Sequence, residues 1–317
     1  MYLCVSANPA IDKRLRVETL QRGRVNRVCE AESFAGGKAA HVAMVLRTLG
    51  EKPRWIGPCG GASGSELLVG LSSLGIEAAG FATVQPTRTN LEILETDGTV
   101  TEILEPGPAL SAEEWTAFEG KCIELFAHGK ERLSVIFSGS LPKGTAPNLY
   151  ERLIRLAHKL KCRTLLDTSG EALQKGLGAK PEFVKPNREE ASRLLKMPIT
   201  SVPSGASAIR KLMKLGANSA ALSLGAEGLL FCDGLDEPVL HAAGIPVKGR
   251  STVGCGDSAL AGFALGLASQ LSAEETLQLA AACATANCLA DSPGAARLED
   301  IRQFQNQISV QSLDFQA

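Results

Sequence analysis

The stretch KAAHVAMVLRTLGEKPRWIGP, residues 38–58, contains one complete unit of the pattern that determines the fold. Residues 38–50 have helical character and end at a glycine, which commonly follows the last turn of a helix. Residues 53–58 form a short strand-like run directly after it. A helix that leads at once into a short apolar strand is typical of a sheet whose strands are connected by helices.

The alternation of helix-like and strand-like segments continues on both sides of this stretch. Residues 65–75 again have the pattern of a helix that ends in glycine. Further strand-like runs lie at residues 2–7, 133–139, 162–169 and 219–225. This alternation predicts a three-layer α/β fold in which a mostly parallel sheet carries helices on both faces. The chain has 317 residues and no low-complexity linker, so we expect one domain over residues 1–317.

Two segments interrupt the alternation and predict a small β-lid on the α/β body. Residues 12–34 contain alternating charged residues and no helical period, and residues 88–105 read as two strands around an Asp-Gly pair, a common hairpin signal. Ile93 and, across the turn, Ile103 are expected on a dry face, and Glu92 on a wet one. Because a thin lid cannot bury an apolar face alone, we expect it to form a homodimer contact.

The composition excludes several kinds of partner and site. The chain is 44% hydrophobic and 21% charged with a formal net charge of −1, so nothing indicates a nucleic acid or a membrane surface as a partner. We expect no signal peptide, and the longest apolar stretch, residues 259–271, is too short to span a bilayer. Nine cysteines without a C-x-x-C pair argue against a zinc site or a disulfide framework, so we expect a cytoplasmic location.

The turn Gly-Cys-Gly-Asp at residues 254–257 combines two glycines with a carboxylate at the start of a small-residue helix. Free amides at a helix N-terminus bind anions, and glycines let a phosphate approach the backbone. A carboxylate beside such a pocket can take a hydroxyl proton while the amides stabilise a transferred phosphoryl group. The turn therefore predicts Asp257 as a catalytic base. The residues before it, Gly254, Cys255 and Gly256, would form the anion hole.

Other interpretations of this turn remain open on the residues alone. An aspartate near a helix start commonly serves only as a cap, and this applies to Asp257. The spacing Gly254-x-Gly256-x-x-Ala259 matches the loose dinucleotide fingerprint, but it lies near the end of the chain and no acidic residue ends a following strand. The chain has no Walker A loop. The expected helix N-terminus would favour the thiolate of Cys255, so we expect a reactive thiol there.

Nine short motifs stand in the order in which one kinase family has them: SANPAID (6–12), VNRV (25–28), AGGK (35–38), TRTN (87–90), SGSLPKG (138–144), LDTSG (166–170), KPNREE (185–190), SLGAEG (223–228) and TVGCGDS (252–258). Over nearly its whole length the chain resembles the ribokinase-like, PfkB-type sugar kinases. It is most similar to the branch that acts on phosphorylated ketohexoses, which includes 1-phosphofructokinase, tagatose-6-phosphate kinase and the minor type of 6-phosphofructokinase. The resemblance implies a Rossmann-like central sheet with a β-lid.

The resemblance also implies the cofactors ATP and Mg²⁺. The nucleotide-binding residues that it implies are Lys185, Asn187, Ser223, Gly225, Gly228 and Asn287. Asn187 and Glu190, from the N-x-x-E motif, would organise Mg²⁺ through water, which suits an ion that prefers oxygen ligands. Two alternatives remain: Asn187 is also well placed to cap a helix, and Asn287 is equally well explained as a polar residue on a buried, alanine-rich helix.

On the acceptor side, the resemblance implies a sugar site that includes Asp12, Gly37, Lys38, Asn90 and Ser138. Arg27 and Arg88 come from the two lid segments and are expected to clamp a phosphate, because arginine binds phosphate bidentately. The chain departs from the usual G-G-K-G-x-N motif at Ala39 and His41. The family's Asn contacts a sugar hydroxyl, whereas His41 is larger and can carry a charge, which leaves the identity of the sugar open.

These features together predict an ATP-dependent kinase that transfers the γ-phosphoryl group to a primary hydroxyl of a phosphorylated ketohexose. Fructose 1-phosphate, tagatose 6-phosphate and fructose 6-phosphate are the expected candidates. A kinase of an unphosphorylated sugar or nucleoside is the alternative, and an inactive sugar-phosphate binding protein is a more remote one.

Overall fold

The computed structural model describes residues 1–129, 133–249 and 251–313. Its larger sheet has ten strands. Its parallel strands are β5 (Glu77–Ala82), β4 (Pro53–Cys59), β1 (Tyr2–Val5), β8 (Ser134–Ser138), β9 (Arg163–Asp167), β10 (Phe183–Val184) and β11 (Ser219–Ser223), in this spatial order. The sheet continues with the antiparallel strands β12 (Leu229–Cys232), β13 (Val239–Ala242) and β14 (Val310–Leu313). The mostly parallel sheet expected from the alternation is confirmed.

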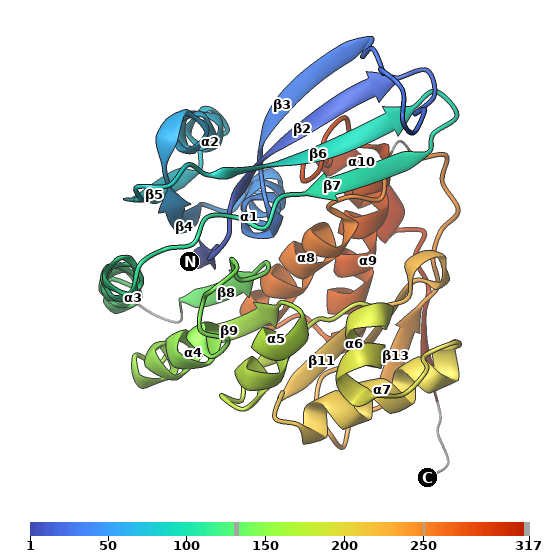
Figure 1. The fold of residues 1–317 in the computed structure, drawn as a ribbon. Helices are drawn as coiled ribbons and strands as arrows, with labels where there is room; N and C mark the ends of the chain where they lie inside the picture. Colours follow the sequence, from blue (N-terminus) through green and yellow to red (C-terminus); the bar gives the residue numbers. More distant parts are fainter. Residues whose placement is uncertain (130–132, 250, 314–317) are drawn as a thin grey trace.

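Helices cover both faces of this sheet and give the expected three layers (Figure 1). One face packs against α1 (Lys38–Thr48), α2 (Gly61–Ser73), α8 (Cys255–Ser269), α9 (Ala273–Leu289) and α10 (Leu298–Gln305). The other face packs against α3 (Ala112–Ala127), α4 (Leu149–Lys159), α5 (Gly170–Leu177), α6 (Arg188–Leu195) and α7 (Val202–Lys214). Each layer of helices has its own apolar core against the sheet.

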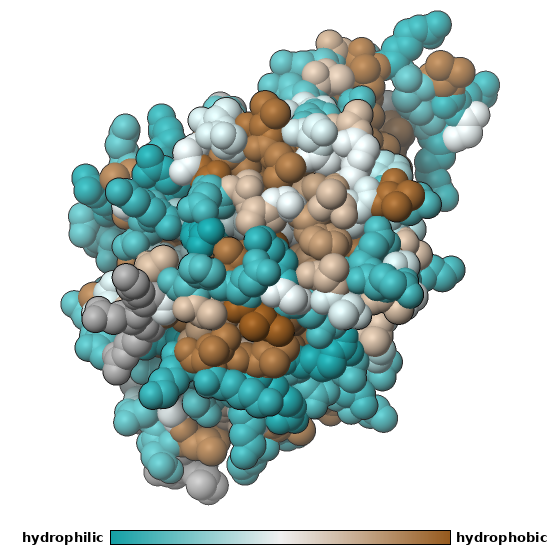
Figure 2. Space-filling model, turned by 90° about the vertical axis from the view of Figure 1, so that its left-hand side faces the viewer, coloured by the Kyte–Doolittle hydropathy of each residue, from teal (hydrophilic) through white to brown (hydrophobic). Residues whose placement is uncertain are grey.

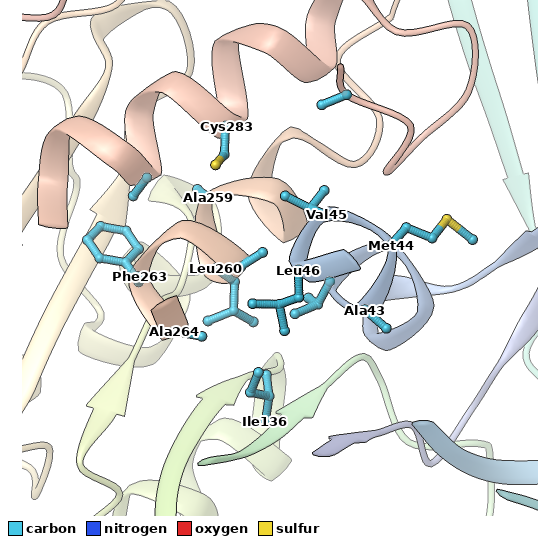
Figure 3. Packing of buried hydrophobic residues seen from close by; sticks show 14 of the residues in the cluster. Ala43, Met44, Val45, Leu46, Ile136, Ala259, Leu260, Phe263, Ala264 and Cys283 are labelled. Atoms are coloured by element: carbon cyan, nitrogen blue, oxygen red, sulfur yellow. The ribbon is translucent and has the colours of Figure 1, made fainter. Parts of the chain in front are cut away.

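The packing of α1 against α8 brings two distant parts of the chain together. Leu46 of α1 and Leu260 of α8 meet above Ile136 of β8 (Figure 3). The neighbouring α9 approaches α8 very closely, because a Cβ added at Gly262 would lie 2.5 Å from the Cα of Ala280. The small residues of α8 and α9 are therefore a packing requirement, and this packing holds α8 beside α1.

The lid is a second sheet of four strands that projects from the body (Figure 1). Its order is β3 (Glu30–Gly36), β2 (Ala10–Val17), β6 (Arg88–Glu95) and β7 (Val100–Leu104). β2 pairs in parallel with β6, while β3 and β7 add antiparallel edges. The two segments expected to form a lid, residues 12–34 and 88–105, both contribute to this sheet.

The expected wet and dry faces of the lid hairpin are wrong in part. Glu92 is buried and forms an ion pair with Arg14, in which Nη2 lies 2.8 Å from Oε2. Ile103, expected on the dry face, is 51% exposed, while Ile93 is buried as expected. The physical reason is that a buried glutamate is tolerated when an arginine on the adjacent strand satisfies its charge, a partner that the alternation of polar and apolar residues does not reveal.

The surface seen from the side of α2, β5 and α3 is mainly hydrophilic, with separate apolar patches (Figure 2). Within the described residues, no helix has the length and apolarity needed to cross a membrane.

Candidate active site

Polar residues gather where four neighbouring parallel strands end. Ser138 ends β8, Asp167 ends β9, Lys185 directly follows β10, and Ser223 ends β11. The carboxyl ends of parallel strands lie at one edge of a sheet, which is the usual ligand site of such folds. The lid begins at this edge, because β2 follows β1 after a short turn.

The N-terminus of α8 lies at the same edge and offers free amides. Gly254 is its N-cap and has a left-handed backbone with φ of 80°. Within the described residues, the amides of Gly256 and Asp257 donate no hydrogen bond, as expected of the first turn of a helix. The amide of Cys255 donates to the carbonyl of Thr252 at 3.3 Å. Of the expected anion-hole residues, Gly254 and Gly256 keep amides without a hydrogen-bond acceptor among the described residues, as does Asp257, whereas the amide of Cys255 is used. The anion hole itself stays a prediction.

The carboxylate of Asp257 is buried and bound to His41 of α1. Nδ1 of His41 lies 2.8 Å from Oδ2 of Asp257, and Nε2 of the same ring lies 2.9 Å from Oδ2 of Asp12 on the lid strand β2. Asn90 of β6 donates to the other oxygen of Asp12 at 2.9 Å. Three of the expected site residues, Asp12, His41 and Asp257, thus form one hydrogen-bonded chain.

The two glycines before α1 make room for this arrangement. A Cβ on Gly36 would lie 2.3 Å from Cγ of Asp12, so no larger residue fits there. The amide of Gly37, whose φ is 84°, donates to Oδ2 of Asp12 at 3.2 Å. Burial would raise the pKa of Asp12, but the hydrogen bonds from His41, Asn90 and Gly37 outweigh it and lower the pKa below its usual value.

A cluster of opposite charges lies next to the free amides. Asp167 is buried and binds two cations, with Nζ of Lys185 at 2.9 Å and Nζ of Lys38 at 3.2 Å. The Lys185 ammonium group lies beside the first turn of α8, since a Cβ added to Gly256 would be 3.4 Å from it. Lys38 is also 3.8 Å from Glu190, and these carboxylates raise its pKa against the lowering effect of burial.

Asp167 was not among the expected site residues, although it stands within one of the nine motifs. Its position at the carboxyl end of a buried strand was the available signal, because ligand-site residues of α/β sheets concentrate there. Its two partners come from α1 and from the loop after β10, so the pairing itself becomes visible only in three dimensions.

The expected metal pair forms a helix cap. The side chain of Asn187 accepts from the amide of Glu190, and the side chain of Glu190 accepts from the amide of Asn187, both at 2.9 Å. This capping box uses the only side-chain oxygen of Asn187 and one oxygen of Glu190, and it leaves Oε1 of Glu190 facing Lys38. The described residues contain no group of three or more His, Cys, Asp or Glu that could cage an ion. The pair does not fit direct coordination by the protein alone, and an ion held through water stays a prediction.

Of the residues expected at the nucleotide, Ser223 and Gly225 lie at a turn next to open space, whereas Gly228 is required by the close packing of the backbone. Ser223 forms a bridge with Asn187, and the turn that follows it, residues 224–228, places Gly225 next to open space. Gly228 serves the backbone, because a Cβ there would lie 2.0 Å from the carbonyl oxygen of Ala242.

Asn287 of α9 is fully used in holding the turns around α8. Its Nδ2 donates to the carbonyl of Val253 and its Oδ1 accepts from the amide of Gly294, both at 2.8 Å. The side chain is also buried. These bonds give Asn287 a supporting role, which is the alternative that the sequence left open, and a contact with the nucleotide stays a prediction.

The expected phosphate clamp is not assembled within one chain. Arg88 lies at the root of the lid and donates to the carbonyls of Asn8, Pro9 and Glu105. Arg27 is exposed in the loop between β2 and β3, beyond the far end of β2. β2 spans eight residues from the position that pairs with Arg88, so the two arginines are separated by roughly 20 Å of strand. The correction is that, of the two arginines, only Arg88 lies near Asp12. The carboxylate of Asp12 interacts electrostatically with the guanidinium group of Arg88.

Two polar atoms on the acceptor side have no hydrogen-bond partner within the described residues. They are Oδ1 of Asn90 and Oγ of Ser138, and both are buried. Buried polar atoms are usually satisfied by protein, water or ligand. Both residues were expected to bind the sugar, and their unpaired atoms are consistent with hydroxyl groups as partners.

The expectation of a reactive Cys255 thiolate is wrong. Its Sγ lies 3.2 Å from Sγ of Cys288 on α9, and this hydrogen bond, together with burial, raises the pKa of Cys255. The same hydrogen bond lowers the pKa of Cys288 to about 7 against the opposing effect of burial. Of the two sulfur atoms, the one with the lowered pKa belongs to Cys288, which is where we expect the thiolate.

Alkylation of the native protein at pH 7 should label Cys288 faster than the exposed Cys29. A thiol with a pKa of about 7 is about half ionised at this pH, whereas an ordinary thiol is ionised to a few per cent. Mass spectrometry of peptides after short exposure to iodoacetamide measures the two rates. Cys283 is the internal control, because it is buried and its pKa is raised to about 12. Faster labelling of Cys29 would contradict the assignment.

This arrangement, with a carboxylate and cations around free helix amides beneath a β-lid, is that of a carbohydrate kinase. The chain belongs to the pfkB family of carbohydrate kinases, whose family model matches residues 3–300. Tagatose-6-phosphate kinase of Staphylococcus epidermidis is 32% identical over 314 residues, which are 98% of this chain and 99% of the relative. 1-Phosphofructokinase of Bacillus subtilis is 30% identical over 315 residues, 99% and 100% of the two chains.

The solved structures agree with this family membership. Phosphofructokinase-2 from Escherichia coli in complex with substrates and products has a TM-score of 0.89 and 28% identity, covering 97% of this chain and 98% of that one. A putative ribokinase from Agrobacterium tumefaciens has a TM-score of 0.74 at 19% identity and shows the shared fold. The resemblance inferred from the nine motifs is confirmed, and the protein is a sugar kinase with a ribokinase-like fold.

Proposed function

We propose that the protein transfers the γ-phosphoryl group of ATP to a primary hydroxyl of a phosphorylated ketohexose. The observation that carries this proposal is the buried carboxylate of Asp257 beside the free amides of α8, with the ammonium group of Lys185 next to them. Relatives that span the whole chain are named as kinases of tagatose 6-phosphate and fructose phosphate, which supports an acceptor that already carries a phosphate.

In this proposal Asp257 accepts the proton of the acceptor hydroxyl as its oxygen forms a bond to the γ-phosphorus. The bond between that phosphorus and the oxygen bridging to the β-phosphate breaks, and ADP leaves. The amides of Gly256 and Asp257 and the Lys185 ammonium group stabilise the charge on the transferred group. Asp12 and Asn90 hold sugar hydroxyls at the root of the lid.

Mg²⁺ fits the site as an ion held through water by Glu190 and Asn187, where it would neutralise charge on the ATP phosphates. The capping box keeps these two side chains at the start of α6 in any case. Lys38 lies between Glu190 and Asp167 and supplies a fixed positive charge at the same place.

A coupled assay of ADP release over a panel of acceptors tests the proposal. The panel contains fructose 1-phosphate, tagatose 6-phosphate, fructose 6-phosphate, fructose and ribose. We expect the highest kcat/KM for one of the three phosphorylated ketohexoses. A preference for fructose or ribose would assign the protein to the kinases of free sugars, and no turnover of any acceptor would indicate a binding protein.

Arg88→Ala should raise the KM for the sugar phosphate by tens-fold and leave the KM for ATP nearly unchanged. Arg88 lies beside Asp12 and is half-buried, and a charge-assisted hydrogen bond contributes on the order of 1.5–3 kcal/mol. Arg88→Lys should restore only part of the loss, because lysine lacks the planar fork. Steady-state kinetics with each substrate varied in turn measure both values. Equal effects on the two KM values would show that Arg88 only supports the lid.

We also propose a homodimer that forms through the lid, in a protein of the reducing cytoplasm. The support is the exposure of apolar lid residues: Val25 is 83% exposed, and Leu104 and Ile103 are more than half exposed. A related phosphofructokinase-2 from Escherichia coli, with a TM-score of 0.87, has a tetrameric inhibited form. All nine cysteines are unpaired, as expected of a reducing compartment.

Light scattering at micromolar concentration should give twice the mass of one chain, and Ile103→Glu should give the monomer. A charge on an apolar contact opposes its burial. Leu160→Glu, at an exposed leucine that ends α4 on the α/β body, is the control and should stay dimeric. A monomeric wild-type protein would contradict the lid contact.

A further inference from the structure

His41 joins two carboxylates that come from different parts of the molecule. Asp12 lies on the lid strand β2, Asp257 lies at the start of α8, and His41 lies on α1 between them. Its two ring nitrogens are 2.9 Å and 2.8 Å from these carboxylate oxygens, and the ring is almost completely buried. A neutral imidazole has only one N–H group, so both contacts are hydrogen bonds to ionised carboxylates only when the ring is protonated.

The charges around the ring favour this protonated form. Besides Asp12 and Asp257, Glu102 of β7 interacts electrostatically with His41. Lys38, which lies on α1 like His41, interacts electrostatically with Asp257. Burial alone would lower the pKa of His41, but the hydrogen bonds and charges of the two aspartates outweigh it and raise the pKa to about 10. The surroundings of the ring therefore favour its protonated form between these two side chains.

We propose that His41 is a positioning residue that couples the sugar-binding carboxylate of the lid to the catalytic base. This inference rests on the proposed function. Nδ1 binds Oδ2 of Asp257 and leaves Oδ1, which has no hydrogen bond within the described residues, for the acceptor hydroxyl. Nε2 holds Asp12, and with it the lid strand, in register with that oxygen. The cation also offsets the repulsion between two carboxylates bound to one ring.

The two contacts can be removed separately. The amide nitrogen of asparagine is separated from Cα by the same number of bonds as Nδ1 of histidine. The amide nitrogen of glutamine is separated from Cα by the same number of bonds as Nε2 of histidine. His41→Asn therefore keeps a donor toward Asp257 and loses the one toward Asp12, while His41→Gln does the opposite.

We expect His41→Asn to raise the KM for the sugar phosphate by about tenfold or more with kcat within a few-fold of wild type. His41→Gln should lower kcat by about tenfold or more with little change in KM, as each variant loses a hydrogen bond to a charged group. If His41 were purely structural, both variants would change the same kinetic parameter, either kcat or KM, and that result would overturn the proposal. His158→Asn is the control and should change neither value, because His158 lies on α4 and its ring contacts Thr164 at 2.8 Å.

A second measurement does not depend on activity. The chain has four histidines, so NMR titration can follow His41 after single His→Asn changes at His128, His158 and His241 assign the others. The His41 ring should stay protonated beyond pH 8 in the wild type, and its pKa should fall by about one unit or more in Asp12→Asn and in Asp257→Asn. Titration of His41 near 6.5 in the wild type would overturn the proposal. If His41 stays protonated beyond pH 8 but none of the acceptors in the panel is phosphorylated, the result counts against the proposed function alone.

Discussion

Asp257→Asn should lose about 10²–10⁴-fold in kcat while the protein stays folded and still binds ATP. Asparagine has the size of aspartate and still accepts a hydrogen bond from His41, but it cannot take a proton from the acceptor hydroxyl. Steady-state kinetics give kcat, and calorimetric titration with ATP gives the nucleotide affinity. The amides of α8 and the Lys185 ammonium group remain in place, so a residual rate above the uncatalysed reaction is expected.

The matched control is Asp236→Asn, which makes the same chemical change at an exposed position between β12 and β13. It should behave like the wild type in both measurements. If Asp257→Asn keeps kcat within a few-fold of the wild type, Asp257 is only a helix cap, the alternative that the sequence left open.

Asp167→Asn should lower the free energy of unfolding by about 3–5 kcal/mol, because it leaves a buried lysine without its anion. The affected cation is Lys185, whose side chain is 3% exposed; Lys38 is less affected because its side chain is 39% exposed. The positive charges of Lys185 and Lys38 outweigh burial and lower the pKa of Asp167, so its stabilising effect is fully present above the ordinary value of 3.8 and is lost as the pH falls below it. Urea denaturation at pH 7 measures the change.

The double variant Asp167→Asn/Lys185→Met separates stability from function. Removing the unpaired charge should restore most of the lost stability, whereas activity should stay low because the cation beside the anion hole is also missing. If the free energy of unfolding of the single variant Asp167→Asn stays within about 1 kcal/mol of the wild-type value, the charge cluster is sufficiently hydrated to tolerate the loss of this carboxylate.

The α/β body and the lid could be predicted because each depends on a local period. Residues 38–58 contain a helix and a strand whose lengths and glycine stop are visible in the sequence, and the structure begins both elements at the expected residues. The lid strands were recognisable because their polar alternation and Asp-Gly turn differ from the helical pattern. Such signals need only neighbouring residues.

The charge pairings of the site could not be predicted, because they join residues far apart in the chain. Glu92 is buried on account of Arg14, 78 residues away, and Asp167 is paired with Lys38, 129 residues away. The departure at His41 was visible in the sequence, but its two carboxylate partners were not. Asn287 was assigned to the nucleotide because a sequence position alone does not show that both ends of the side chain are already bonded.

The most direct test of the central claim is ³¹P NMR of a reaction mixture that contains ATP, Mg²⁺ and a phosphorylated ketohexose. With the wild-type protein, the signals of ADP and of a second phosphomonoester on the sugar should rise together in equal amounts, and with Asp257→Asn neither should appear on the same time scale. ADP accompanied by inorganic phosphate instead of a sugar bisphosphate would contradict the account, because it would mean that the site transfers the phosphoryl group to water and not to the sugar.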